Sequence, residues 1–181
     1  MNKKNRADYS SHRSGIPEIR ARQTMLVKRF RARRISFRIT YIYRMKIAII
    51  NGPNLNLLGI REPGIYGRQT FEDFLKDLKE KYPAVQIDYF QSNVEGELVN
   101  ELQRVGFDYD GILLNAAAYT HTSVAIGDAI TAIKTAVIEI HISNVAAREE
   151  YRQKSLISAK SVGSITGLGL KGYELGLLYF L

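Results

Sequence analysis

The stretch KIAII at residues 46–50, followed at once by NGPNLNLLG at residues 51–59, decides the fold of this chain. A short apolar run rich in isoleucine that stops at turn residues is typical of a buried parallel strand. A second run of this kind, residues 136–140 (AVIEI), ends at residues 141–144 (HISN). Open α/β sheets bind ligands at the carboxyl ends of their strands, so we expect both polar runs to contribute to one pocket.

Strand-like and helix-like patterns alternate from Met45 to the end of the chain. Apolar runs predict five strands, the last of them weak, at residues 46–50, 85–90, 111–114, 136–140 and 161–165. Apolar spacing and capping residues, Thr70 among them, predict helices at residues 71–81, from 92 or 93 to 105, 123–134, 146–155 and 173–181. This alternation predicts an α/β fold: a flavodoxin-like, doubly wound, five-stranded parallel sheet with helices on both faces.

The charge of the chain is divided unevenly. Residues 1–44 carry thirteen Lys or Arg and two acids, a net charge of +11, whereas residues 45–181 carry thirteen against sixteen, a net charge of −3. We therefore predict a basic N-terminal extension, residues 1–44, and one domain, residues 45–181. Three interpretations of the extension stay open: a disordered basic tail, a targeting peptide, or upstream sequence translated from an early start, since Met45 directly precedes the first strand. Contact of this tail with nucleic acid or an anionic membrane is a minor alternative.

Several classes of protein are excluded or disfavoured by what the sequence lacks. The chain has no cysteine, so disulfides, a thiolate nucleophile and thiolate-bound zinc are excluded. No apolar run approaches the length of a membrane span, and we expect a cytoplasmic protein. Neither a dinucleotide-binding nor a P-loop glycine pattern follows the first strand. Instead a long segment, residues 51–67, connects it to the next helix, as in an active-site lid or a surface excursion.

Three ordered motifs resemble the type II 3-dehydroquinate dehydratases. They are residues 51–67 (NGPNLNLLGIREPGIYG), residues 114–123 (LNAAAYTHTS), and residues 139–144 (EIHISN) with 148–152 (REEYR). The resemblance covers residues 45–181. It implies a lyase of the shikimate pathway that converts 3-dehydroquinate to 3-dehydroshikimate by anti elimination through an enolate, without metal or organic cofactor. A flavodoxin-like module that binds a ligand without catalysis is the alternative.

The resemblance also implies the catalytic roles. Tyr66 is expected to act as the base in its tyrosinate form, and a cation such as Arg61 favours the phenolate. Lowering a tyrosine pKa from about 10 to about 7 takes roughly 4 kcal/mol. His141 is expected to protonate the departing hydroxyl, and Asn54 to support the enolate through an ordered water. We expect Glu139 to point to the other side of a regular strand, where a bend at the strand end would let it orient the imidazole.

The remaining expected roles concern substrate binding and assembly. The resemblance implies that substrate hydroxyls and the substrate carboxylate are held by Asn115, His121, the amides of Ile142 and Ser143 with the Ser143 hydroxyl, and Arg152, and that Arg148 anchors the lid. Asp128 matches a position that enters the pocket of a neighbouring subunit in this family. The implied assembly is a homododecamer of four trimers, and Asp128 would otherwise be an exposed helix acid.

Overall fold

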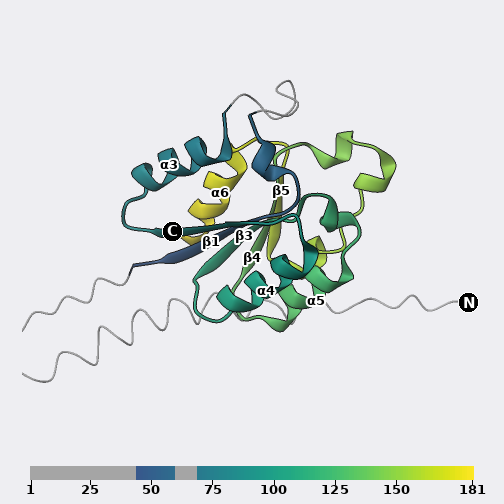
Figure 1. Cartoon of the computed structure of the whole chain (residues 1–181), viewed down its shortest axis with the longest axis horizontal. Coiled ribbons are helices and arrows are strands. Elements are labelled where there is room, and N and C mark those ends of the chain that lie inside the picture. Colours follow the sequence, from purple (N-terminus) through teal and green to yellow (C-terminus); the bar gives the residue numbers. More distant parts are fainter. Residues whose placement is uncertain (1–43, 60–68) are drawn as a thin grey trace, which may run out of the picture. The chain divides into compact units, whose positions relative to one another are not determined.

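Five parallel strands form one sheet in the computed structural model, which describes residues 44–59 and 69–181 (Figure 1). The strands are β1 (Lys46–Asn51), β2 (Gln86–Gln91), β3 (Gly111–Asn115), β4 (Val137–His141) and β5 (Gly163–Thr166). Their order across the sheet is β2-β1-β3-β4-β5, and every neighbouring pair is parallel. This is the flavodoxin-like order, so the predicted fold class is confirmed, with strand bounds within two residues of those expected.

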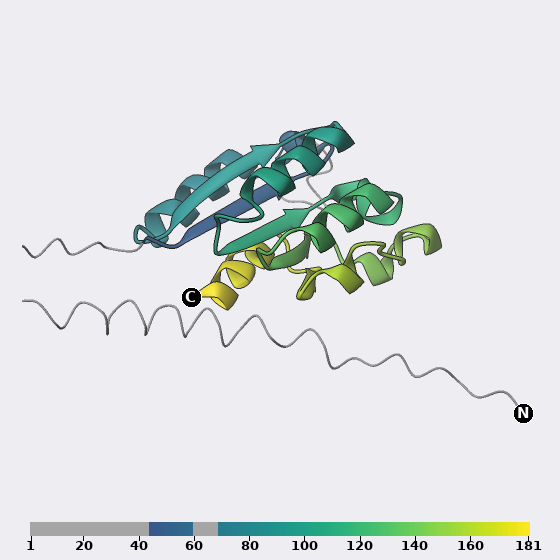
Figure 2. The same ribbon diagram turned by 90° about the horizontal axis from the view of Figure 1, so that it is seen from below.

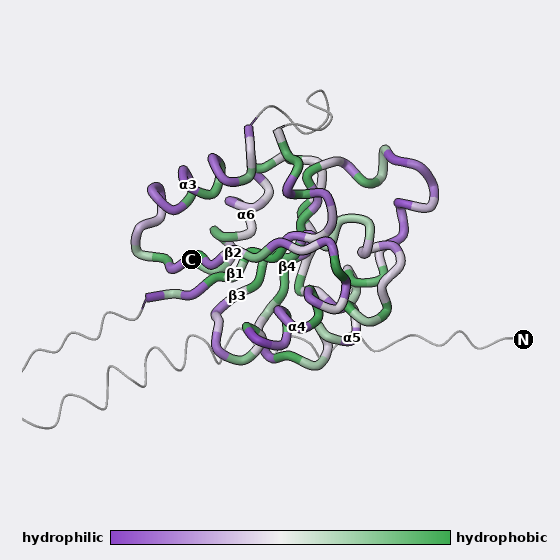
Figure 3. The backbone as a smooth tube through the Cα atoms, in the orientation of Figure 1, coloured by the Kyte–Doolittle hydropathy of each residue, from purple (hydrophilic) through white to green (hydrophobic). Residues whose placement is uncertain are grey.

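In the described residues, α-helices cover both faces of the sheet (Figures 1 and 2). They are α3 (Phe71–Lys81) and α6 (Lys171–Phe180) on one face, and α4 (Glu95–Val105) and α5 (Val124–Ala132) on the other. Successive side chains of a strand point to opposite faces, so Ile49 of β1 belongs to the apolar core under α3 and α6, while Ile50 belongs to the core under α4 and α5. Both faces of the central strands are thereby buried, which explains their continuous apolar sequence (Figure 3).

Side-chain caps fix the starts of two helices close to where the sequence predicts them. The Thr70 hydroxyl accepts a hydrogen bond from the amide of Asp73 at 3.1 Å, and the Ser123 hydroxyl accepts one from the amide of Ile126 at 2.9 Å. The predicted start of α4 is two or three residues too early, because Ser92 forms a turn before the helix by accepting from the amide of Val94 at 2.9 Å.

The helix predicted for residues 146–155 is wrong. Two single 3₁₀ turns stand there, η5 (Val145–Ala147) and η6 (Glu150–Arg152). The amide of Arg148 donates to Val145 at 3.1 Å and that of Arg152 to Glu149 at 2.8 Å, both three residues back. Between the turns Arg148 is extended, so a continuous helix cannot form, and a segment this short gains little from helix propagation.

Two predicted features lie outside the described residues. The basic extension falls there apart from Arg44, and so does the part of the connection, residues 60–68, that contains Arg61 and Tyr66. Within residues 44–59 and 69–181, none of the helices has both the length and the apolar character required to cross a membrane.

Candidate active site

A crevice lies at the carboxyl ends of β1, β3 and β4. The chain leaves β1 toward a helix on one face and leaves β3 toward a helix on the other, which is the switch point where doubly wound sheets bind ligands. Three connections line the crevice: Pro53, Asn54, Leu55, Leu57 and Leu58 after β1; Asn115, Ala117, Ala118 and His121 around the end of β3; His141, Ile142, Ser143, Val145, Arg148 and Arg152 after β4. Both polar runs identified in the sequence therefore line the same crevice.

The segment after β1 is held closely against the end of β3. The amide of Gly52 donates to the carbonyl of Asn115 at 2.7 Å, and a Cβ at position 52 would lie 2.6 Å from the carbonyl oxygen of Ala116. Only glycine fits that approach. Asn54 has a left-handed backbone with φ of 66°, a conformation that Asn tolerates, and its amide donates to Asn93 Oδ1 at 2.9 Å. This geometry leaves the exposed Asn54 side chain at the crevice.

Asn115 is oriented by a buried tyrosine. Its Nδ2 donates to the Tyr173 hydroxyl at 2.9 Å, and that hydroxyl donates to Asn51 Oδ1 at 2.8 Å. Burial raises the pKa of Tyr173 far above its ordinary value, so the phenol stays neutral and keeps its proton for Asn51. Asn115 Oδ1 accepts from the amide of Ala117 at 3.1 Å. The amide group is thus fixed, and its second N–H remains for a ligand in the crevice.

His141 and Glu139 form a buried pair on β4. Nε2 of His141 donates to Oε1 of Glu139 at 2.8 Å, and the carboxylate is fully buried. The expectation that Glu139 points to the other side of the strand is wrong. Residues two apart in a strand share a face, so the two side chains meet without any bend, and a carboxylate partner assigns the Nε2 proton to the imidazole.

Glu139 is surrounded by hydroxyl groups that the sequence reasoning missed. Ser155 Oγ donates at 3.0 Å and Ser164 Oγ at 2.9 Å, and the hydroxyls of Thr120 and Ser158 also donate to the carboxylate. Burial by itself would raise the pKa of Glu139, but the hydrogen bonds from His141, Ser158 and Thr120 outweigh it and lower the pKa to about 2. The carboxylate is therefore ionised at neutral pH.

The predicted topology holds a partial signal for this hydroxyl cluster, because the fourth and fifth strands of a flavodoxin-like sheet are neighbours. Strand β5 pairs with β4 in a register that sets Ser164 opposite Glu139. The sequence alone does not fix that register, because the weak apolar character of β5 allows several alignments.

A second imidazole stands beside the first. His121 lies 6.4 Å from His141 between ring centroids, with the rings inclined by 22°. Its Nδ1 donates to the carbonyl of Lys154 at 2.8 Å, because a carbonyl oxygen can only accept. Nε2 of a neutral His121 is then left as an acceptor for a substrate hydroxyl.

Two arginines give the crevice a positive rim. Arg148 and Arg152 both pair with Glu149, at 3.3 Å and 3.1 Å, and Arg148 also donates to the Ser143 hydroxyl at 3.5 Å. The amides of Ile142 and Ser143 have no hydrogen-bond acceptor among residues 44–59 and 69–181. Adjacent backbone N–H groups beside cations form a suitable site for a carboxylate.

Asp128 does not line this crevice, and two further predicted site residues cannot be placed relative to it because they lie outside the described residues. Asp128 lies on α5 with its side chain 71% exposed, 3.5 Å from the Lys160 ammonium, and it does not line the crevice of its own chain. Tyr66 and Arg61 lie outside the described residues, so the proximity expected between them stays a prediction.

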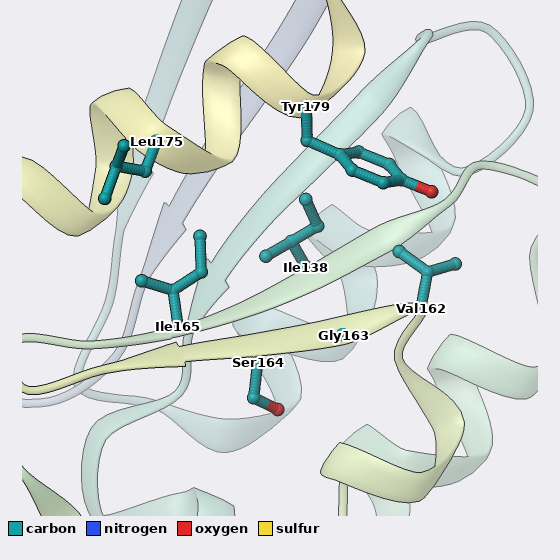
Figure 4. Close-up of a pocket in the computed structure, with 7 residues that line it drawn as sticks. All are labelled: Ile138, Val162, Gly163, Ser164, Ile165, Leu175 and Tyr179. Carbon is teal, nitrogen blue, oxygen red and sulfur yellow. The ribbon is translucent and has the colours of Figure 1, made fainter.

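A separate apolar groove runs between β5 and α6 (Figure 4). Its lining is Ile138, Val162, Gly163, Ser164, Ile165, Leu175 and Tyr179. Among the described residues, no acidic or basic side chain lines this groove. In the part of the chain that the structure describes, no three His, Asp or Glu side chains are grouped as metal ligands.

Comparison with known proteins points to one family. The sequence model described as "Dehydroquinase class II" matches residues 45–181. A 3-dehydroquinate dehydratase of Campylobacter lari is 52% identical over 136 residues, which are 74% of this chain and 85% of that protein. One of Fusobacterium nucleatum is 50% identical, over 76% of this chain and 97% of that protein.

Solved structures agree with these sequence relatives. A type II dehydroquinase from Butyrivibrio crossotus superposes with a TM-score of 0.73 at 42% identity, covering 76% of this chain and 97% of that one. The type II dehydroquinase from Propionibacterium acnes gives a TM-score of 0.69 at 39% identity, covering 74% and 94%.

Proposed function

Because the chain belongs to the class II dehydroquinase family, we propose that it dehydrates 3-dehydroquinate to 3-dehydroshikimate as a step of the shikimate pathway. The observation that carries this proposal is the pairing of His141 with the buried, ionised Glu139 at a positively charged crevice. Such a pair provides a proton donor next to a site for an anionic substrate.

The reaction sets four requirements. A proton leaves the carbon next to the ketone, an enolate forms, and a hydroxyl departs from the neighbouring carbon as water. The site must supply a base, electrostatic support for the enolate, an acid for the hydroxyl, and a hold on the substrate carboxylate.

His141 serves as the acid in this proposal. Its Nε2 proton is committed to Glu139 at 2.8 Å, so Nδ1 of the imidazolium carries the proton that goes to the departing hydroxyl. The ionised carboxylate holds the ring in place through this hydrogen bond and balances the positive charge of its protonated form. A positioned acid of this kind contributes about 10²- to 10⁴-fold to the rate.

Tyr66 serves as the base, with Arg61 lowering its pKa, and these two roles rest on the sequence motif alone. Asn54 supports the enolate through a water. This role of Asn54 is supported by its position on the crevice, in the segment that leads into residues 60–68. The reaction then needs no metal or organic cofactor.

The substrate is held by groups on the other two connections. The amides of Ile142 and Ser143, with the Ser143 hydroxyl, bind the substrate carboxylate. Asn115 and His121 bind hydroxyls, the former with its second N–H. Arg152 binds a hydroxyl or closes over the crevice, and Arg148, already bonded to Ser143, anchors the lid.

Assembly is part of the same proposal. We propose a homododecamer in which Asp128 reaches the crevice of a neighbouring subunit. This proposal is supported by the Asp128 side chain, which is 71% exposed on α5 and pairs with Lys160. It does not line the crevice of its own subunit. A cytoplasmic location also stays a prediction.

The proposal is tested by turnover of 3-dehydroquinate, followed through the ultraviolet absorbance of the enone product. The full chain is expected to form the enone, and Tyr66→Phe, which keeps the ring but not the ionisable hydroxyl, is expected to bind substrate without turning it over. A wild-type chain that binds 3-dehydroquinate without forming product would instead support the ligand-binding module.

A further inference from the structure

Glu139 receives more hydrogen bonds than its pairing with His141 requires. Oε1 accepts from Thr120, Ser155 and His141, and Oε2 accepts from Ser158 and Ser164. The four hydroxyls come from three separate parts of the chain: the 3₁₀ turn η4 (Ala117–His121), the segment around η7 (Ser158–Lys160), and β5. A cluster gathered from three elements around one side chain is a built feature of the fold.

We propose that Thr120, Ser155, Ser158 and Ser164, here called the hydroxyl cage, are positioning residues that keep Glu139 ionised and aimed at His141. The inference rests on the proposed function only in taking His141 as the acid. None of the four residues needs to touch substrate.

The burial of Glu139 explains why a cage is needed. The residue is 0% exposed, and a buried carboxyl without donors takes up a proton instead of remaining charged. The proton nearest to it is the one on His141 Nε2. If that proton moved to Glu139 Oε1, the pair would become a carboxylic acid beside a neutral imidazole, and a neutral imidazole is a far weaker acid than imidazolium. The cage prevents this transfer by stabilising the carboxylate.

The hydroxyl proton of Ser155 is directed at Glu139 by the other contacts of this serine. Ser155 Oγ accepts from the amides of Ile157 at 3.2 Å and Ser158 at 2.9 Å, so its own proton is left for Glu139. Figure 4 shows Ser164 on the opposite side of β5 from Leu175 and Tyr179 of α6, which is the side on which Glu139 lies.

The other charged groups around the pair stay unchanged when a cage hydroxyl is removed. His121 of η4 lies beside His141, and Arg148 and Arg152 line the same crevice as His141. Lys160 of η7 pairs with Asp128 of α5. A shift in the titration of Glu139 in a serine variant therefore reports the lost hydroxyl.

The test is the titration of Glu139 in the full chain carrying Ser158→Ala, Ser164→Ala, or both. Infrared difference spectroscopy detects the carbonyl band of the protonated carboxyl, which is assigned by its absence in Glu139→Gln. We expect the pH of protonation to rise by about one unit for each hydroxyl removed, since a hydrogen bond to a charged group is worth at least that much. Ser164→Thr, which keeps a hydroxyl and suits a strand, is expected to restore the wild-type titration.

Ser161→Ala is the matched control. Its hydroxyl lies in the same segment and donates to the carbonyl of Ile157 at 3.2 Å rather than to Glu139, so the titration is expected to stay unchanged. A double variant in which Glu139 titrates as in wild type would overturn the proposal.

Kinetics supply a second and independent readout. The loss of kcat caused by Ser158→Ala with Ser164→Ala is expected to exceed any change in KM, and to disappear when Glu139 is already Gln, because the serines act through the carboxylate. An equal loss in both backgrounds would mean a structural role and would overturn the inference. The infrared titration does not depend on turnover, so an inactive wild-type chain would refute the proposed function and leave the cage to be judged by its titration.

Discussion

Replacing Glu139 with Gln is the most informative change in the crevice. It removes the charge beside His141 with little change in size. A hydrogen bond to a charged group contributes about 1.5–3 kcal/mol, and the bond from His141 Nε2 to Glu139 Oε1 is 2.8 Å long and fully buried. Loss of a hydrogen bond of that strength corresponds to roughly 10- to 100-fold in rate.

The assay is kcat and KM for 3-dehydroquinate as a function of pH. Glu139→Gln is expected to lower kcat by that factor with little change in KM. The reasoning is refuted if the variant keeps the wild-type kcat.

Glu174→Gln is the matched control for this experiment. Glu174 of α6 is also a buried glutamate, and it does not line the crevice. Its carboxylate accepts hydrogen bonds from Lys81 at 2.6 Å and from Tyr82 at 2.8 Å. Hydrogen bonds from Lys171 and Lys81 lower its pKa to about 2, like that of Glu139. The variant is expected to lose stability and to keep the wild-type kcat.

Three further predictions concern the supports of the crevice. Gly52→Ala is expected to lower both kcat and the free energy of unfolding, the latter by about 1–3 kcal/mol, because the new Cβ would lie 2.6 Å from a backbone oxygen; steady-state kinetics and urea titration measure the two effects. Tyr173→Phe is expected to raise KM more than it lowers kcat, because Asn115 loses the acceptor that orients it; substrate titration separates the two constants. Acidification from about pH 4.5 toward pH 2 is expected to lower the free energy of unfolding by up to roughly 3 kcal/mol. The reason is that the lowered pKa of Glu139 makes the folded state bind this proton less readily than the unfolded chain. Urea unfolding at a series of pH values measures the loss, which Glu139→Gln should reduce.

The two substitutions at Gly52 and Tyr173 each have a control in the same chain. Gly96→Ala, on α4 with no atom within 4 Å of the new Cβ, is expected to raise stability by about 0.5–1 kcal/mol and leave kcat unchanged. Tyr179→Phe removes a hydroxyl from a side chain of α6 that is 51% exposed, and KM should not move. Equal effects in a variant and its control would contradict the geometric explanation.

The fold could be read from local signals because those signals agree with the packing. The isoleucine run of β1 and the Thr70 cap of α3 lie where the sequence predicts them. The helix expected at residues 146–155 does not form, because the Asn144 side chain accepts from the amide of Ala146 at 3.1 Å and closes a single turn.

The site could be predicted only in part, because much of it is tertiary. His141 stands on the crevice as expected, and the motif that contains it is contiguous in sequence. Ser158 and Ser164 follow Glu139 by 19 and 25 residues. The turn η7 and the register of β5 bring these two distant hydroxyls to the carboxylate. A contiguous motif cannot contain that information.

The role of His141 is tested most directly by hydrogen exchange at the carbon next to the ketone, measured with the His141→Ala variant in deuterated water. Proton removal and departure of the hydroxyl are separate steps in the proposed chemistry, so losing the acid should block only the second step. The variant is expected to incorporate deuterium into 3-dehydroquinate while forming the enone at least about 100-fold more slowly than wild type. Enone formation at the wild-type rate, or loss of exchange together with elimination in a variant that still binds substrate, would contradict the assignment of His141 as the acid.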